Sequence, residues 1–472
     1  VDKSTRINFR GNFGYTPNQN ESNSQSASFD APPGVNHENL FSDFESVPRD
    51  IKVNRSENRS RSENESHRYH WAMGVMRRLN EKGTTLGLNI QNSDSWGNNE
   101  SFSLSETTYF RLKDKNGNDS VLYRNQYLKS PQRNNSWRVG LSFTQPVGKK
   151  VRLRVAYNWS TRYERSNRDT YELSSLASSD IYGELPSGYE AGYVDSLSNR
   201  SHSRSNGHDL NVGVNYSDDT WMFNASLGVT PQRRTIDRKV GKLYADTAMN
   251  MIDFQPMIWM SWRKKEMRVS LNYNGNTRQP SLSDLMPLTD NSNPLYITRG
   301  NPDLKQMFSH NIRLNFQNSP KGISANLGGQ VEQNSVTQVM IYDVQTGGRE
   351  TYPVNINGNW NLSGGASWWK RFGHFSLRLD MSGNHSNRVG MINEDKSLQP
   401  EKSTTRDTGL NCEAQASYQP SWGGIDLSTS WNYQYSLNSL NDNDTYTRYY
   451  NFGLNGYVDF PFGLQLRTDA TY

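Results

Sequence analysis

The sequence contains a single cysteine, Cys412, so it can form no internal disulfide and no zinc site built from cysteine ligands. It also has no run that approaches the roughly 18 consecutive apolar residues of a transmembrane helix. Only 33% of its 472 residues are hydrophobic, which is low for a soluble protein of this length. These shortages exclude a helical membrane protein and disfavour an ordinary soluble core.

Aromatic side chains, in contrast, are abundant. The chain has 25 Tyr, 17 Phe and 12 Trp, too many for a disordered protein. Its net charge is only +5, and no compact basic segment carries aromatic platforms, so we expect no nucleic-acid partner. Many polar and many aromatic residues together are typical of a β-barrel with a wet inner wall.

The segment VRLRVAYNWS, residues 151–160, alternates without a break. Apolar side chains from Val151 to Trp159 fall on one face, while Arg152 and Arg154 fall on the other. In a soluble sandwich the apolar face would line the core, and in an outer-membrane barrel it would face lipid. The same alternation recurs at 137–144, 267–274, 375–382 and 450–460.

Connections decide between these two folds, because tight turns rich in Gly, Pro and Asn alternate with longer polar loops. We predict the longer loops at 31–50, 113–119, 173–198, 239–247, 280–306, 345–350, 395–402 and 439–446. Short turns at one end and long loops at the other are typical of an antiparallel transmembrane β-barrel. Five tryptophans beside short turns predict an aromatic girdle at the membrane surface: Trp221, Trp262, Trp368, Trp369 and Trp422. We predict roughly 17 strands, near 3–30, 51–79, 84–112, 119–145, 151–172, 199–217, 221–238, 248–261, 267–279, 307–317, 323–345, 351–369, 374–394, 403–418, 425–438, 447–459 and 464–472.

The longest informative loop lies at 278–305, RQPSLSDLMPLTDNSNPLYITRGNPDLK. It resembles the R-x-P-x-L-x-x-L segment and the closing G-N-P-x-L-K of TonB-dependent outer-membrane receptors. The matching residues are Arg278, Pro280, Leu282, Leu285, Gly300, Asn301, Pro302, Asp303, Leu304 and Lys305. Segments 67–90 and 136–160 are similar to the Bacteroidetes branch of these receptors, the outer-membrane-protein β-barrel family.

This resemblance implies a barrel of about 22 strands around an N-terminal plug, in the outer membrane of a Gram-negative bacterium. It also implies uptake of a large solute, driven through the TonB system, with a surface lipoprotein as a further possible partner beside the membrane lipid. We therefore expect residues 1–472 to be one barrel domain, truncated at both ends and lacking the plug. A non-transporting scaffold or interaction barrel, or a passive porin, is the alternative.

The loop at 278–305 has two readings. Pro280 and Pro302 fix the backbone and Gly300 permits a tight bend, which favours a structural role at the barrel rim. Direct contact with a solute stays open, as it does for loops 31–50 and 173–198, where Tyr182, Tyr189 and Tyr193 could stack on a ligand.

The sequence gives little support for a calcium site or for an enzyme active site. DKNGND, residues 114–119, spaces its first oxygen ligands like a calcium loop but lacks the later Glu, so a hairpin tip is the better interpretation. No Ser/His or Asp/His constellation can be singled out. We expect no enzyme, no cofactor and no metal site, and the transported solute is not specified by the sequence.

Overall fold

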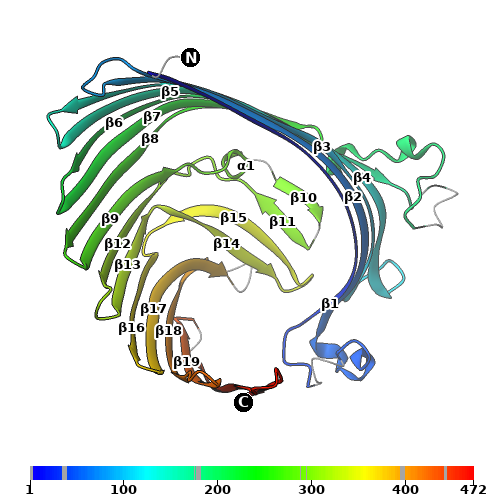
Figure 1. The fold of residues 1–472 in the computed structure, drawn as a ribbon. Coiled ribbons are helices and arrows are strands. Elements are labelled where there is room, and N and C mark those ends of the chain that lie inside the picture. Colours follow the sequence, from blue (N-terminus) through cyan, green and yellow to red (C-terminus); the bar gives the residue numbers. More distant parts are fainter. Residues whose placement is uncertain are drawn as a thin grey trace.

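The computed structural model describes residues 4–34, 40–174, 176, 182–286, 289–293, 295–393, 399–440 and 444–472. These residues form one sheet of 21 strands. Seventeen of the strands make a continuous curved wall, and four lie inside its curve (Figure 1). The wall thus has the number of strands that the alternation predicts.

The wall strands are β1 (Thr5–Phe29), β2 (Lys52–Arg78), β3 (Thr85–Lys113), β4 (Asp119–Val147), β5 (Val151–Glu172), β6 (Asn199–Ser217), β7 (Trp221–Val240), β8 (Leu243–Lys264), β9 (Met267–Arg278), β12 (Met307–Asn318), β13 (Ile323–Gln333), β16 (Trp360–Phe372), β17 (Phe375–Asn393), β18 (Glu401–Tyr418), β19 (Gly423–Asn438), β20 (Thr445–Asp459) and β21 (Gln465–Thr471). The remaining elements are η2 (Phe44–Ser46), η3 (Arg49–Ile51), η4 (Tyr189–Gly192), η5 (Asp195–Leu197), α1 (Leu282–Leu285), β10 (Thr289–Asn293), β11 (Tyr296–Arg299), β14 (Ser335–Asp343) and β15 (Gly348–Ile356).

Neighbouring wall strands are all antiparallel, and each pairs with the next in chain order except where inner elements intervene. β9 pairs directly with β12, and β13 pairs directly with β16, so the wall continues across both insertions. Within the described residues β1 and β21 do not pair with each other, and the sheet is an open arc (Figure 1). The fold is therefore an incomplete antiparallel barrel.

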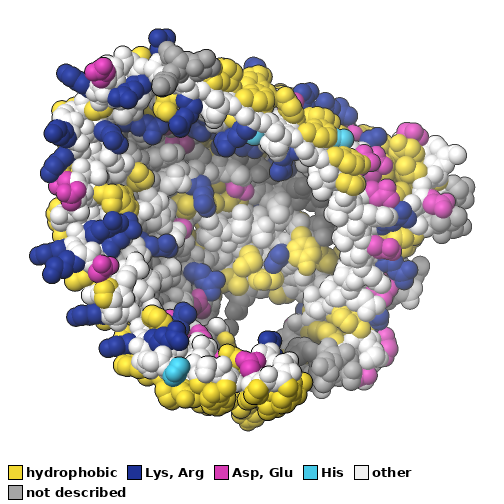
Figure 2. All heavy atoms as spheres, viewed as in Figure 1, with side chains coloured by type: hydrophobic (Ala, Val, Ile, Leu, Met, Phe, Trp, Pro, Cys, Tyr) yellow, Lys and Arg dark blue, Asp and Glu magenta, His cyan; other side chains and the backbone are white. Residues whose placement is uncertain are grey.

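The apolar face of the alternation points outward, and hydrophobic side chains line the lower outer edge of the wall in Figure 2. Leu314, Leu327 and Leu379 keep 42%, 51% and 50% of their surface exposed, values that would be costly in water for a whole belt of side chains. The register brings such residues opposite one another from strand to strand, as in Leu271 opposite Leu314. A lipid-facing outer surface explains this belt, which confirms the assignment of VRLRVAYNWS to a membrane wall.

The tryptophan girdle is confirmed in part. Trp221 and Trp262 lie opposite each other on the outward face, with ring centroids 6.5 Å apart. Trp368 also points outward beside a short turn, opposite Ile323. Trp369 follows it directly and therefore lies on the other face of β16, because successive side chains alternate.

Several predicted boundaries are wrong. The predicted strand 323–345 is two strands, β13 and β14, which the chain separates at Asn334, a residue with φ +53°. The predicted strand 351–369 is likewise β15 and β16. The segments 113–119 and 239–247 are tight hairpins instead of long loops, since β3 joins β4 and β7 joins β8 there. At 114–119 the Asp114 carboxylate accepts the N–H groups of Asn116 and Asn118, which confirms a hairpin tip.

Candidate functional site

Four inner strands form a shelf inside the wall. β10 pairs with β11, β11 runs parallel to β15, and β15 pairs with β14. β14 runs parallel to the last residues of β17, which attaches the shelf to the wall. Figure 1 shows these strands, with α1, lying across the space that the wall encloses. We call β10, β11, β14 and β15 the shelf.

The loop motif begins by packing on the wall. Ser281 caps α1, since its Oγ accepts the Asp284 N–H at 3.1 Å. Leu285 and Met286 then join Leu304, Ile236 and Val240 in a buried apolar cluster against β7. Burial of such side chains stabilises the loop by the hydrophobic effect.

Gly300 occupies the tightest point of the motif. A Cβ built there would lie 1.9 Å from the Met286 carbonyl oxygen and 2.9 Å from that of Asp284. No side chain fits at such distances, so this position requires glycine for close backbone approach. The next residue, Asn301, donates its backbone N–H to the Asp284 carbonyl at 2.5 Å.

The rest of the motif holds the shelf. The Asn301 side chain donates to the Pro353 carbonyl at 2.9 Å and accepts the Asp303 N–H at 3.0 Å. Lys305 and Asn355 exchange two hydrogen bonds, at 2.6 and 2.9 Å. These hydrogen bonds, each between a side-chain amide and a backbone group, thus clamp β15 to the motif loop.

The other motif residues surround this clamp. Arg278 ends β9 opposite Met307, and Pro280 is buried. Pro302, Asp303 and Lys305 are exposed. Leu282 begins α1, and its side chain lies outside what the structure describes. Their arrangement is that of a rim scaffold, and contact with a solute stays a prediction for each of them.

The far end of the shelf reaches the opposite part of the wall. Asn54 of β2 donates to the Thr346 carbonyl at 2.8 Å, and Arg111 of β3 donates to that of Val344 at 2.9 Å. Gly347, with φ +66°, leaves room for Asn54 at this contact. The turn between β14 and β15 therefore spans the enclosed space.

The loop tyrosines do not face this space. Tyr189 and Tyr193 pack on Tyr171, with ring centroids 5.1 and 5.7 Å apart, and Tyr189 also packs on Tyr127, which is 1% exposed. Tyr127 and Tyr171 lie opposite each other on the outward face of β4 and β5. Figure 1 shows this loop outside the wall. These two tyrosines therefore lie outside the enclosed space, and their stacking on a ligand stays a prediction.

Tyr182 also lies on the outer side of the wall. Burial raises the pKa of its hydroxyl, and Glu21, Arg59 and Arg61, all outward residues of β1 and β2, act on it electrostatically. Alternation places this surface above the apolar belt, where strands of 25 and 27 residues extend beyond the bilayer. Loop 182–198 is thus a cover for the outer face of the projecting wall.

Inside the wall, a polar cavity of about 580 Å³ lies against β2–β7. Its lining includes Arg68, Arg234 and Glu164, with serine, asparagine and glutamine side chains between them. Arg68 lies opposite Ser95 on the luminal face, next to the outward His67. Ser281, at the start of the motif loop, also borders this cavity.

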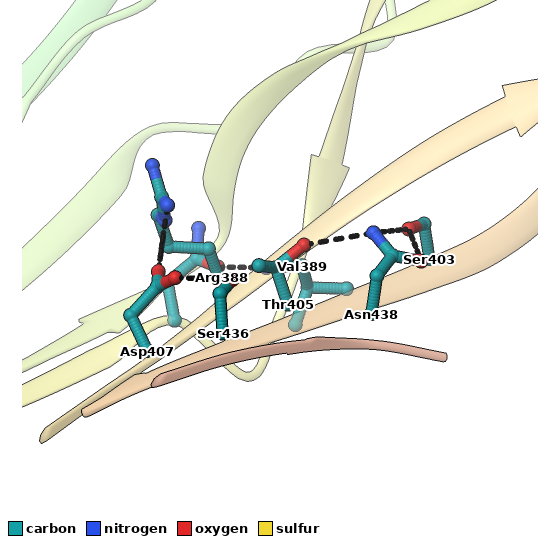
Figure 3. Close-up of polar contacts among 8 residues, drawn as sticks. Arg388, Val389, Ser403, Thr405, Asp407, Ser436 and Asn438 are labelled. Carbon is teal, nitrogen blue, oxygen red and sulfur yellow. Dashed lines mark hydrogen bonds and ion pairs between the residues drawn. The ribbon is translucent and has the colours of Figure 1, made fainter. Parts of the chain in front are cut away.

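A second polar cavity, of about 720 Å³, lies against β13 and β16–β20. Figure 3 shows its ion pair, Arg388 with Asp407 at 2.6 Å, and the Ser436 hydroxyl that donates to Asp407 at 2.7 Å. Asn438 bonds Ser403 and Thr405 further along the same strands. Amide and hydroxyl groups dominate both cavities, so the lumen suits a hydrophilic solute.

The described part of the chain shows neither a metal-binding cluster nor a membrane-spanning helix. Its His, Cys, Asp and Glu side chains form no cluster of three or more that could hold a metal ion. None of its helices is long and apolar enough to cross a membrane.

The wall carries an apolar belt on its outward face and polar side chains on its luminal face, and tight turns join its strands at one end. These features define a transmembrane β-barrel of the outer-membrane class. Residues 77–458 match the profile of the family described as "Outer membrane protein beta-barrel family". The chain belongs to this family and is a protein of the Gram-negative outer membrane.

Solved structures give weaker likenesses. The copper transporter OprC is 9% identical with a TM-score of 0.45, over 98% of this chain and 73% of that one. The siderophore receptor PirA from Pseudomonas aeruginosa is 11% identical with a TM-score of 0.37, over 100% and 77%. The Serratia marcescens hemophore receptor HasR, solved as a double mutant with its hemophore HasA and heme, is 9% identical with a TM-score of 0.41, over 99% and 80%. A comparison with curated proteins gives no match.

Proposed function

We propose that this chain forms the wall of a TonB-dependent receptor that takes up a large hydrophilic solute across the outer membrane. The observation that carries the proposal is the shelf, because it extends across the polar lumen and contacts the opposite wall. A passive porin would need an open path, whereas a receptor needs a site that can be closed from outside.

In this proposal residues 1–472 are one barrel domain, and the parent protein supplies a plug and further strands. The unpaired edges of β1 and β21 support this, since unpaired strand edges do not occur in the hydrocarbon region of a membrane. The TonB system would act through the plug region. A surface lipoprotein could cover the rim.

The experiment that tests the proposal uses the complete protein and its coding region. We expect a plug-sized domain and a TonB-contacting segment upstream of residue 1, and no steady conductance in a planar lipid bilayer. Steady conductance without a plug would instead identify a porin. Absence of both conductance and a plug would identify a scaffold barrel, which is the second candidate function. In that case the outward loop 182–198, with its aromatic packing, would be part of the scaffold's surface.

A further inference from the structure

The luminal face of the wall is divided by charge. The strands β1–β9 and β12, which we call the basic arc, carry arginines at luminal positions that include Arg68, Arg138, Arg154, Arg162, Arg234 and Arg313. Among the described luminal residues of these strands, the carboxylates are Glu164, Glu172, Asp209 and Asp253.

The opposite part has the reverse balance. The strands β13 and β16–β21, which we call the acidic arc, carry Glu332, Asp380, Asp407, Glu413 and Asp426 at luminal positions. Two of their arginines are paired, Arg378 with Asp380 and Arg388 with Asp407, each at 2.6 Å. One side of the lumen is thus positive and the other negative.

Only some arginines of the basic arc are neutralised in this way. Glu164 is held by Arg162 at 2.5 Å and by the Ser203 hydroxyl at 3.1 Å. Asp209 accepts bonds from Asn158 and Thr230, which are neutral. Within the described residues, no carboxylate lies at ion-pair distance from Arg68 or Arg234, and Asp253 of β8 acts on Arg234 electrostatically from farther away.

We propose that the cavity on the basic arc binds an anionic group of the transported solute, a phosphate, sulfate or carboxylate, through Arg68 and Arg234. This deepens the proposed function and rests on it. The guanidinium group presents a planar fork of donors that matches such oxyanions. Hydroxyl and amide groups such as those of Ser95 and Gln132 line the same cavity and supply further donors.

The acidic arc sharpens this selectivity. A solute anion in the lumen is attracted to one wall and repelled from the other, because the two charged surfaces face each other across a confined space. A neutral or cationic solute would gain nothing at Arg68 and Arg234. The solute is therefore held with its negative group toward β2–β7.

The test uses the complete protein in neutral detergent, with the fluorescent trisulfonate pyranine as the probe. Fluorescence anisotropy measures its affinity for wild type, for the double variant Arg68→Gln/Arg234→Gln and for Arg204→Gln. Arg204 is the matched control, since it lies on β6 next to luminal Ser203 and Ser205 but points outward. A mobility shift between heated and unheated samples on a denaturing gel reports whether each barrel is folded.

We expect the double variant to bind pyranine at least 10-fold more weakly, Arg204→Gln to stay within twofold of wild type, and added salt to weaken wild-type binding. Absence of wild-type binding would overturn the proposal, as would equal binding by the folded double variant. If neutralising Arg68 and Arg234 instead releases a plug, these arginines serve an internal acidic surface, and the proposal also fails.

The experiments distinguish failure of the anion-binding proposal from failure of the proposed receptor function. Energised uptake of a neutral solute, without pyranine binding, would leave the receptor function in place and refute the anionic class. Arginine-dependent pyranine binding by a protein that shows steady conductance and no plug would establish the site and refute the receptor.

Discussion

The two sides of the wall differ in height. Strands β1–β5 have 22 to 29 residues, whereas β9, β12 and β13 have 12, 12 and 11. About 9 to 11 residues cross a bilayer, so the short strands end near the membrane surface and the long ones project beyond it.

This difference explains where the chain places its other elements. Next to the short strands, the residues between β9 and β12 and between β13 and β16 build α1 and the shelf. Next to the long strands, loop 182–198 covers the outer face, and charges of both signs pair there, as in Arg133 with Asp94 at 2.9 Å. On its luminal face the tall side contacts the shelf through Asn54 and Arg111.

The largest expected effect tests whether the short side and the tall side of the wall are placed differently in the membrane. Leu314→Arg, at an outward mid-belt position of β12, should destabilise the protein by about 2–4 kcal/mol. Val121→Arg, at a 54% exposed outward position of β4 far from its periplasmic turn, should cost much less. Reversible unfolding in lipid vesicles measures both, with luminal Asn315→Arg as the control on β12. Equal costs at Leu314 and Val121 would place the tall side in lipid.

A smaller effect is expected where the motif clamps the shelf. Gly300→Ala puts a methyl group against the Met286 and Asp284 carbonyls and should cost about 1–3 kcal/mol locally. Gly390→Ala on β17 is the control, since nothing lies within 4 Å of its Cβ position. Limited proteolysis should cut the shelf of the Gly300 variant faster while the wall stays intact. Unchanged cleavage would show that the shelf does not depend on this clamp.

The contact between shelf and tall side should contribute less. Asn54→Ala removes the hydrogen bond to the Thr346 carbonyl, worth about 1 kcal/mol. Hydrogen exchange of residues 343–349 should accelerate several-fold, while Asn58→Ala, which loses only a bond to Ser56 within β2, should leave it unchanged. Equal protection in the Asn54 variant would mean that the shelf holds its place without the tall side.

The smallest effect concerns the periplasmic turns, where the two sides resemble each other. At the turn 218–220, the Tyr216 hydroxyl and the N–H groups of Trp221 and Thr220 lower the pKa of Asp218 below its ordinary value of 3.8. A lowered folded-state pKa stabilises the protein at pH values above 3.8, and this stabilisation is lost as the pH falls through the folded-state pKa. Asp218→Asn should flatten the acid limb of the pH–stability curve slightly, and an unchanged limb would show that this turn does not titrate on unfolding.

The sequence anticipated the wall much better than the elements inside it. Alternation at 151–160 and at similar runs indicates a two-faced strand, because side chains of a strand point to opposite sides whatever the partner. Turn residues at sites such as 146–150 fix where strands reverse. The division of 323–345 at Asn334 was missed, since both β13 and β14 alternate and only their partners, β16 and β15, differ.

The motif at 278–305 was recognisable as a loop with special backbone needs, yet its contacts were not. Asn301 bonds Pro353 and Lys305 bonds Asn355, residues about 50 positions away. Equally, Tyr189 could be seen as an exposed loop tyrosine, but only its contacts with Tyr127 and Tyr171 show that it faces outward.

The sequence by itself determined that this chain is an outer-membrane wall, because the period of two and the rhythm of short turns and long loops are local properties that the membrane imposes on every strand. The tertiary structure alone decided which luminal charges share a side, where the shelf rests and which loop leaves the mouth. Those outcomes depend on strand register and on contacts between distant segments, and neither is written in any one stretch of the chain.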